Sequence, residues 1–403
     1  MRLHLPLLAA GFVLLAAGAL AQTLTRVANL PVTGIPNDIA ITGNRAYVSD
    51  FGNATLQSYN IGTPAAPALL GSVAASTRPR AVAASGSMAY ILGYGIGTST
   101  SSQLNSFNVT NPAAPMLGQG AVLDAPPVYI AAGGSLVCAA SASGTVKVFD
   151  STLNLLSSFS RNATDVVING NALYLSFYGS VSVYDLTNPT TPVFVRTVAG
   201  AIGAVSGNRA CGLYQPNSTS NLLYSYDVSV PLNPVVLGST TVANGYNLVA
   251  TSPTTAFIGQ RYEPIVSTNN LPLQAFAIGA ATAPVLQATA GPNSTATSIA
   301  VVGNAAYLVH EYTNNLQVYA LSGTPTATRD PQSIALGLYP NPAHTSLAVT
   351  LPNPNSPVII YDLAGRARLT AQVATGAPLD ISALTPGVYV VRNGTAVQSL
   401  VVE

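Results

Sequence analysis

Few side chains in this 403-residue chain could do chemistry. Beyond residue 21 it has two histidines, His310 and His344, and no Gly-x-Ser-x-Gly, His-Glu-x-x-His or phosphate-cradling motif. A Ser-His-Asp system would have to use His310, because His344 falls in a C-terminal segment that we interpret as a detachable domain. Asp38 and Asp165 could instead form a catalytic or Ca²⁺ site. We expect them three repeat units apart, which weakens that hypothesis, so we assign no catalytic residue and favour a non-enzymatic protein.

The two cysteines, Cys138 and Cys211, fall in predicted strands two repeat units apart. Buried thiols are a better explanation than a disulfide or a metal site. We therefore predict no metal and no cofactor.

Composition and the N-terminus indicate an exported protein. Only 7% of the residues are charged and the net charge is +1, without the basic stripe that a nucleic-acid partner requires. Residues 1–21 combine Arg2 and His4, an apolar run and a small-x-small end, which predicts a secretory signal peptide cleaved before Gln22. A membrane anchor is the alternative, but the run is short for a bilayer span. No other segment of the mature chain could cross a membrane as a helix.

The elements that must position these side chains come from a nine-residue phrase that occurs seven times between Ile39 and Tyr307. Its fifth residue is Gly in six copies and Pro253 in the other, which predicts a tight turn between two short strands. The copies are IAITGNRAY, VAASGSMAY, YIAAGGSLV, VVINGNALY, GAVSGNRAC, VATSPTTAF and IAVVGNAAY.

A second phrase after each copy alternates apolar and polar residues, the pattern of a half-buried strand, and its fourth residue is always aromatic. An Asp or Asn often follows, which we expect to cap the next bend. Four strands per unit, at a mean spacing of about 43 residues, predict an all-β, seven-bladed β-propeller over residues 22–321. The seventh unit lacks a fourth strand. Residues 24–30 resemble a fourth strand, but no first three strands precede them. We therefore predict that the N-terminal strand closes the ring. The aromatic positions are Tyr59, Phe107, Phe149, Tyr184, Tyr226, Phe276 and Tyr319.

Over residues 23–321 the chain resembles the LVIVD-repeat family of propellers. The best match is the run Tyr184, Asp185, Asn188, Pro189 and Pro192, whereas the third unit lacks both prolines. The resemblance implies an exported or surface protein with a binding role, and it brings no catalytic residues.

Residues 322–333 have the composition of a linker, and residues 334–403 predict a small Ig-like β-sandwich. Three blocks in this segment resemble the C-terminal sorting domain of the type IX secretion system of Bacteroidetes. That resemblance implies recognition by the type IX secretion machinery, then release outside the cell or attachment to its outer surface. The usual basic residue near the end is missing, and an accessory Ig-like stalk is the alternative. The blocks contain Tyr339, Pro340, Asn341 and Pro342, then Tyr361, Asp362 and Gly365, then Gly387 and Tyr389.

In a propeller, the loops that enter the first strands and those that follow the second strands share one face, where ligands commonly bind. A polar centre bordered by tyrosines suits a polysaccharide or an extended peptide, although tyrosines also simply cover hairpin edges. The starts of the first strands supply Asn37, Asp38, Arg80, Asp165, Asn247, Thr297 and Ser298. The other loops supply Asp50, Phe51, Tyr94, Phe177, Tyr178, Tyr214, Arg261, Tyr262, Glu263, His310, Glu311 and Tyr312.

Three functions remain open. The leading hypothesis is a non-enzymatic, exported propeller that binds polysaccharide or protein at or beyond the cell surface. The alternatives are a propeller hydrolase or lyase that acts on polysaccharide, and a surface scaffold for partner proteins.

Overall fold

The structure is a computed structural model, and it describes residues 22–95, 102–123, 127–141, 144–261, 271–280, 282–291, 296–323, 336–351, 356–362, 366–374, 376–393 and 396–403. These residues form two compact units, one within 22–323 and one within 336–403. The predicted signal peptide, residues 324–333 of the predicted linker, and Tyr262, Glu263 and Gly365 lie outside the described residues.

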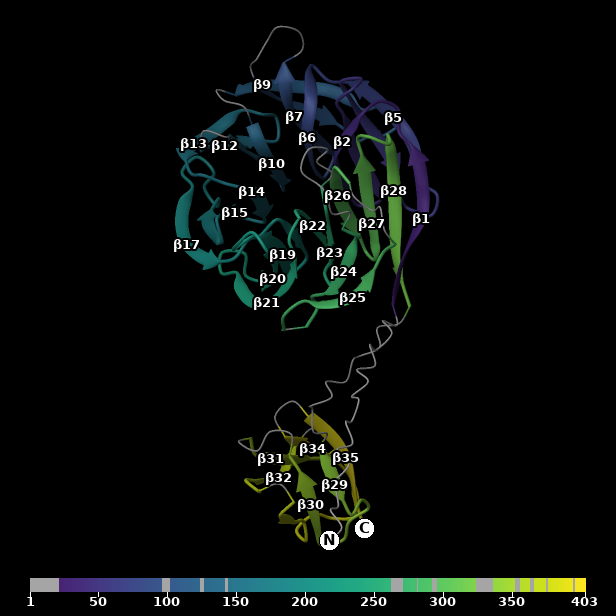
Figure 1. Cartoon of the computed structure of the whole chain (residues 1–403). Helices are drawn as coiled ribbons and strands as arrows, with labels where there is room; N and C mark the ends of the chain where they lie inside the picture. Colours follow the sequence, from purple (N-terminus) through teal and green to yellow (C-terminus); the bar gives the residue numbers. More distant parts are fainter. Residues whose placement is uncertain are drawn as a thin grey trace, which may run out of the picture. The chain divides into compact units, whose positions relative to one another are not determined.

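The first unit is a seven-bladed propeller of four-stranded antiparallel sheets (Figure 1). In each of the first six blades the strands follow one another from the axis to the rim. Blades one to three are β2 (Pro36–Thr42), β3 (Arg45–Asp50), β4 (Thr55–Asn60) and β5 (Ala68–Ala74); β6 (Thr77–Ser85), β7 (Met88–Gly95), β8 (Ser102–Asn108) and β9 (Met116–Leu123); and β10 (Pro127–Gly133), β11 (Leu136–Ser141), β12 (Thr145–Asp150) and β13 (Leu155–Ser160).

Blades four to six repeat this order. They are β14 (Asp165–Asn169), β15 (Ala172–Phe177), β16 (Ser180–Asp185) and β17 (Val193–Ala199); β18 (Ala204–Ser206), β19 (Arg209–Tyr214), β20 (Ser220–Asp227) and β21 (Val235–Ala243); and β22 (Leu248–Thr251), β23 (Thr255–Gly259), β24 (Gln274–Ala277) and β25 (Val285–Thr289).

The seventh blade confirms the predicted closure by the N-terminal strand. It consists of β26 (Ser298–Val302), β27 (Ala305–His310), β28 (Asn315–Ser322) and, at the rim, β1 (Thr23–Pro31). β1 pairs antiparallel with β28, from Thr23 opposite Ser322 to Pro31 opposite Asn315. The innermost strands contact one another in the order β2, β6, β10, β14, β18, β22, β26 and back to β2. The ring is therefore closed, and both edges that an open array would expose are covered.

Positive-φ glycines make the hairpin turn between the first two strands of six blades. Gly43, Gly86, Gly170, Gly207 and Gly303 are the fifth residues of their phrases, with φ between 56° and 58°. In the third blade the turn glycine is Gly134, not the expected Gly133, and Gly133 pairs with Leu136. The third phrase is therefore shifted by one residue relative to the other six when the copies are aligned by their strand pairing. Its Tyr129 occupies the position that Asp38 and Asp165 hold in their own blades.

Seven hydrophobic clusters hold the ring together, one between each pair of neighbouring blades. The seven repeated aromatic residues are all buried, from 0% exposed at Phe107 and Tyr226 to 9% at Tyr184. Burial of one such ring contributes roughly 2–3 kcal/mol. Tyrosines of the second strands also bond to the next blade: the hydroxyl of Tyr174 donates to the carbonyl of Pro231 at 2.6 Å. The aromatic residues at these repeated positions therefore stabilise the propeller fold.

The bend after the third strand has the predicted polar cap. In the fourth blade, the carboxylate of Asp185 accepts from the backbone N–H and hydroxyl of Thr187 at 2.7 and 2.6 Å. Those hydrogen bonds hold the pKa of Asp185 below its usual value. The equivalent residues Asn60, Asn108, Asp150 and Asp227 each accept from the backbone N–H two residues later.

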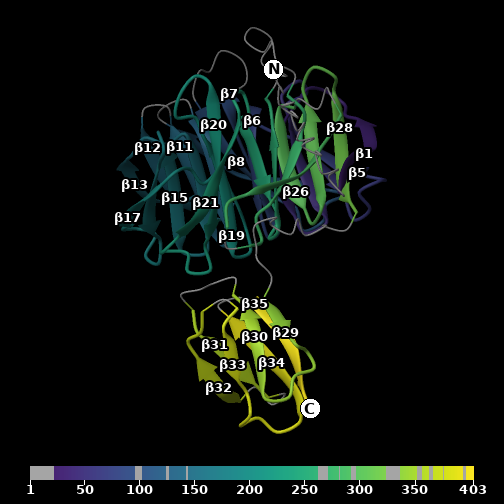
Figure 2. The ribbon, with the colours of Figure 1, turned by 60° about the horizontal axis from the view of Figure 1, so that its bottom comes forward.

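The second unit is a small β-sandwich around its own core (Figure 2). One sheet has the order β29 (Gly337–Tyr339), β30 (Ser346–Thr350), β33 (Pro378–Asp380). The other has the order β32 (Ala367–Ala371), β31 (Val358–Tyr361), β34 (Gly387–Asn393), β35 (Ala396–Val402). Apolar residues from both sheets, including Leu347, Ile360 and Val391, are buried between them.

Candidate functional site

The antiparallel hairpins bring many of the predicted site residues to one face of the propeller. Asp38 pairs with Ser49, and Asp165 pairs with Ser176, so the start of each first strand lies beside the end of the second strand. We call this edge of the ring the candidate face.

Seven residues, one per blade, occupy the same position at the start of the innermost strands, and we call them the inner ring. Four of them are polar and three are apolar. They are Asp38, Ala81, Tyr129, Asp165, Ile202, Leu248 and Ser298.

Asp38 connects three blades through its carboxylate. Oδ1 accepts from the backbone N–H of Ile39 at 2.9 Å and from the hydroxyl of Ser298 at 2.5 Å, while Oδ2 accepts from the backbone N–H of Val82 at 2.8 Å. Burial raises the pKa of Asp38, and these hydrogen bonds together with Arg261 oppose the rise. Asn37, the preceding residue, is also buried. Asp38 therefore has a clear structural role at the junction of blades seven, one and two.

Asp165 has fewer partners. Its Oδ1 accepts from the backbone N–H of Val166 at 2.9 Å, and a Cβ on Gly203 would lie only 2.5 Å from its Oδ2. Burial raises the pKa of Asp165 to about 7, opposed only by that hydrogen bond. Glycine at position 203 is what leaves room for this carboxyl group.

Arg261 connects blades six, one and three electrostatically. Burial raises the pKa of both Asp38 and Tyr129, and Asp165 adds to the rise at Tyr129, whereas the guanidinium of Arg261 opposes both rises. The backbone N–H of Arg261 donates to Oδ1 of Asn247 at 2.6 Å, and Arg261 is exposed. One cation, two carboxyl groups and a phenol thus surround the start of the central channel. The repeat pattern missed Tyr129 because the double glycine after it obscured the register.

A cavity of about 460 Å³, lined mostly by residues with small or apolar side chains, lies along the axis beneath the inner ring. All seven blades line it with residues deeper in their first strands, such as Ala40, Ala83 and Ala300, and it reaches the hairpin turns at Gly170 and Gly207. The polar residues of the inner ring therefore lie at one end of a channel whose lining side chains are mostly small and apolar.

Two arginines lie over aromatic rings on blades one and two. The guanidinium carbon of Arg78 is 5.9 Å from the centre of the Phe51 ring, and that of Arg80 is 5.6 Å from the centre of the Tyr94 ring. Both arginines are exposed. Cation–π contact of this kind contributes about 0.5–1 kcal/mol at exposed sites. Arg78 was not among the predicted residues, because it lies four residues before the repeated phrase, whereas the predicted residues of this group lie within two residues of it.

A second aromatic group lies on blades four and five. Phe177 and Tyr178 contact edge to face with ring centres 4.4 Å apart, and Tyr178 is 79% exposed with φ of 42°. The Tyr214 ring packs directly on Gly179, where a Cβ would lie 2.6 Å from the ring. Tyr178 is thus the exposed aromatic residue of this group, whereas Phe177 and Tyr214 are half-buried.

Asp50, another predicted site residue, is fully buried inside its own turn. Its Oδ1 accepts from the backbone N–H groups of Ile35, Gly52 and Asn53, and its Oδ2 accepts from the side chains of Asn53, Thr55 and Gln57. These donors occupy both oxygens, so Asp50 organises the loops around it.

On blade seven the predicted residues separate into buried and exposed ones. Burial and Arg26 lower the pKa of His310 to about 4, and its buried Nε2 has no hydrogen-bond partner. Thr297 is buried and accepts from the backbone N–H of Glu311 at 3.0 Å. Tyr312 is 54% exposed, so its side chain is accessible from solvent.

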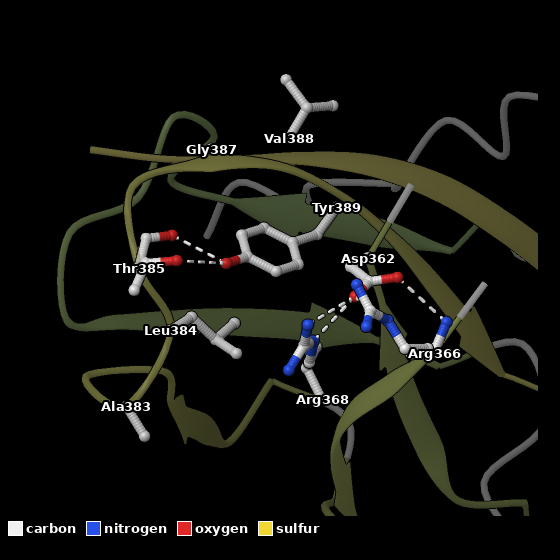
Figure 3. A pocket seen from close by; sticks show the side chains of 9 residues that line it. All are labelled: Asp362, Arg366, Arg368, Ala383, Leu384, Thr385, Gly387, Val388 and Tyr389. Atoms are coloured by element: carbon white, nitrogen blue, oxygen red, sulfur yellow. Dashed lines mark hydrogen bonds and ion pairs between the residues drawn. The ribbon is translucent and has the colours of Figure 1, made fainter. Parts of the chain in front are cut away.

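The C-terminal unit has a pocket of about 660 Å³ that brings two of the sorting blocks together (Figure 3). Asp362 accepts at Oδ2 from Nε of Arg366 at 3.1 Å and from Nη2 of Arg368 at 2.7 Å. The hydroxyl of Tyr389 donates to the carbonyl of Thr385 at 2.8 Å. Other lining residues are Ala383, Leu384, Gly387 and Val388.

The first sorting block holds the last strand. Nδ2 of Asn341 donates to the carbonyl of Ser399 at 2.8 Å, and the backbone N–H of Val401 donates to Oδ1 of Asn341 at 2.9 Å. Tyr339 is 80% exposed. Asn341 therefore supports β35, whereas the other two blocks form the pocket.

The described part of the chain contains no group of three or more His, Cys, Asp or Glu residues that could hold a metal ion. Cys138 and Cys211 are free and buried, and burial raises the pKa of each thiol to about 12. None of the described segments forms a helix with the length and hydrophobicity needed to cross a bilayer.

Comparison with known families identifies both units. The LVIVD repeat matches residues 33–75 and 160–199, and the secretion system C-terminal sorting domain matches residues 337–403. The chain thus carries LVIVD repeats and a C-terminal sorting domain, which implies export through the type IX secretion machinery. No curated protein matches the chain.

Solved structures share the propeller fold. The β-propeller domain of Myceliophteria thermophila Cps50 (Swd1) has a TM-score of 0.55 and 11% identity, covering 72% of this chain and 98% of that one. Chaetomium thermophilum Raptor has a TM-score of 0.52 and 12% identity, covering 74% of this chain and 29% of that one.

Proposed function

We propose that this exported propeller binds polysaccharide through its candidate face, at the cell surface or in the surrounding medium, without transforming the ligand. The observation that carries the proposal is the exposed aromatic surface of Tyr178 beside Tyr214, on the same face as the arginine–aromatic pairs. Flat aromatic rings pack against the apolar faces of sugars, and neighbouring guanidinium groups donate to hydroxyl and carboxylate oxygens. A protein ligand remains the alternative for the same surface.

The hydrogen bonds of the polar residues support binding over catalysis. The carboxylate oxygens of Asp38 and Asp50 accept hydrogen bonds from other groups of the protein. The side chains left for a ligand are mainly arginines and tyrosines, which contribute most at binding surfaces.

A glycan array probed with the full chain tests this proposal. We expect binding to at least one polysaccharide, reduced about tenfold or more by Tyr178→Ala. Leu155→Ala is the matched control, because Leu155 is an exposed side chain on the rim strand of blade three. If no polysaccharide on the array binds, and a partner protein binds both the wild type and Tyr178→Ala, polysaccharide binding would be contradicted. That result would favour a surface scaffold for partner proteins.

A hydrolase or lyase acting on polysaccharide is the second candidate, and one observation favours it. A buried carboxyl group with a pKa of about 7 suits a general acid, and Asp165 borders the channel. An enzyme would release reducing ends from the bound glycan, and Asp165→Asn would abolish that release while leaving binding intact. A chain that binds the glycan and leaves it intact at pH 5–8 would exclude this candidate.

A further inference from the structure

The pocket of the C-terminal unit contains more positive than negative charge. Asp362 is the one acidic residue among the nine lining residues, and it faces both Arg366 and Arg368 (Figure 3). The side chains of the arginines are 70% and 47% exposed, whereas that of Asp362 is 16% exposed. One carboxylate cannot neutralise two guanidinium groups, so the pocket retains a net positive charge and free N–H donors directed to solvent.

Asp362 positions this charge. Its Oδ1 accepts from the backbone N–H of Arg366 at 3.0 Å and its Oδ2 from Nε of Arg368 at 2.8 Å. Restraining both side chains in advance lowers the entropy that binding would cost. Guanidinium groups held in this way favour carboxylates, because the planar fork matches two oxygens.

The neighbouring strand suits a peptide. β32 is the terminal strand of its sheet, and no described strand pairs with its outer side. Ala367, Arg368 and Thr370 are exposed along it. An exposed edge offers backbone N–H and C=O groups to an added strand, and opposite charges across such a pair are stabilising.

A sugar is a poorer fit to the same pocket. The one aromatic residue that lines it, Tyr389, is 7% exposed, and its hydroxyl group is bonded to Thr385. Its ring is therefore not available for a sugar to stack on.

We propose that this pocket docks an acidic, extended peptide segment of the export machinery. The segment adds alongside β32 and places carboxylate side chains on Arg366 and Arg368. This inference rests on the export route through the sorting domain and is independent of what the propeller binds.

The first test is binding of the full chain to a fluorescent eight-residue peptide that alternates Glu and Thr, measured by polarisation at low salt. The Gln-Thr peptide is the control ligand. We expect the Glu-Thr peptide to bind and the double variant Arg366→Gln, Arg368→Gln to lose about tenfold or more in affinity. The double Lys variant should retain part of the affinity because it keeps the charge. Arg392→Gln, which removes the same charge from β34 outside the pocket, should bind normally.

Equal binding of the Glu and Gln peptides, or unchanged affinity in the double Gln variant, would overturn the proposal. So would direct binding of an oligogalacturonate when the Glu-Thr peptide does not bind, since that result assigns the pocket to an anionic sugar. Circular dichroism of each variant checks that the sandwich is folded.

Export in the native host is the second test, and it separates two failures. If deletion of residues 336–403 leaves export intact, the export role of the domain is wrong. If that deletion abolishes export while the double Gln variant is exported like the wild type, the export role stands and the pocket proposal is wrong. We expect both changes to retain the protein inside the cell.

Discussion

The carboxylate of Asp38 accepts a hydrogen bond of 2.5 Å from the hydroxyl of Ser298, although 260 positions separate them in the chain. The bond joins the innermost strands of the first and seventh blades. The other oxygen of Asp38 bonds to Val82 of the second blade. Ring closure thus has an attachment beside the axis in addition to the strand pair β1–β28 at the rim.

Substitution of Asp38 should separate the need for an acceptor from the need for a charge. Asp38→Ala leaves the buried N–H groups of Ile39 and Val82 without that acceptor, and we expect it to cost about 2–4 kcal/mol of unfolding free energy. Asp38→Asn keeps an acceptor, can donate to Ser298 and removes a buried charge, so it should cost less than about 1 kcal/mol. Urea denaturation measures both, with Asp185→Asn as a control at a half-buried bend cap, a position at which blades one and two already have Asn. Equal losses for Ala and Asn would show that the charge itself is required.

Asp165 should make stability fall as pH rises. Its pKa of about 7 in the folded protein lies above the ordinary 3.8, so the folded state binds the extra proton between these values. The stability that protonation provides is complete below about pH 4 and is lost as pH approaches 7. At about 1.4 kcal/mol per pKa unit, the full effect is at most about 4 kcal/mol. Asp165→Asn should remove this slope, and parallel pH curves for variant and wild type would contradict it.

His310 should act in the opposite direction. Its pKa of about 4 lies below the ordinary 6.5, so the unfolded chain binds the proton more readily. Stability is complete above about pH 6.5 and falls on acidification toward pH 4, by at most about 3 kcal/mol. His310→Leu removes the titrating group and the unpaired Nε2, and its stability should be flatter over this window. His344→Leu is the exposed control. Thermal melts from pH 4 to 7 measure this dependence, and an equal fall in the melting temperature for wild type and His310→Leu would contradict the prediction.

The N-terminal strand should contribute to the stability of the whole propeller. Leu24 of β1 is 5% exposed and packs in the cluster between blades six and seven. Leu24→Ala should therefore cost about 2–4 kcal/mol. Its exposed neighbour Thr25 serves as control, since Thr25→Ala removes no buried contact. Deletion of residues 24–30 should lower the melting temperature of the entire unit. A second, separate transition for blade seven alone would contradict cooperative closure.

The sequence predicted the ring well because its signals are local and repeated. Turn glycines such as Gly43 and aromatic residues such as Tyr226 recur at fixed offsets, and each has one physical role. The register of Tyr129 was mispredicted, because two consecutive glycines allow two turn positions. Which of them adopts φ near 57° depends on pairing with the neighbouring strand.

The site was less predictable, since partners from distant blades decide what each polar side chain does. Asp50 and Asp165 look alike in the sequence, yet the first has six donors within and near its own turn and the second has one. The sorting blocks include Asp362, but they include neither Arg366 nor Arg368, with which it forms ion pairs. Sequence pattern thus identifies positions, whereas the hydrogen-bond partners that set their chemistry come from the fold.

The pairing of Thr23 with Ser322 also places ring closure late in folding. A chain that emerges from the N-terminus carries β1 out first, and its partner β28 comes some three hundred residues later. Joining segments so far apart costs loop-closure entropy and slows folding. Blade seven therefore stays incomplete, with the rim edge of β28 and the strand groups of β1 unpaired, until nearly all of the propeller has been synthesised.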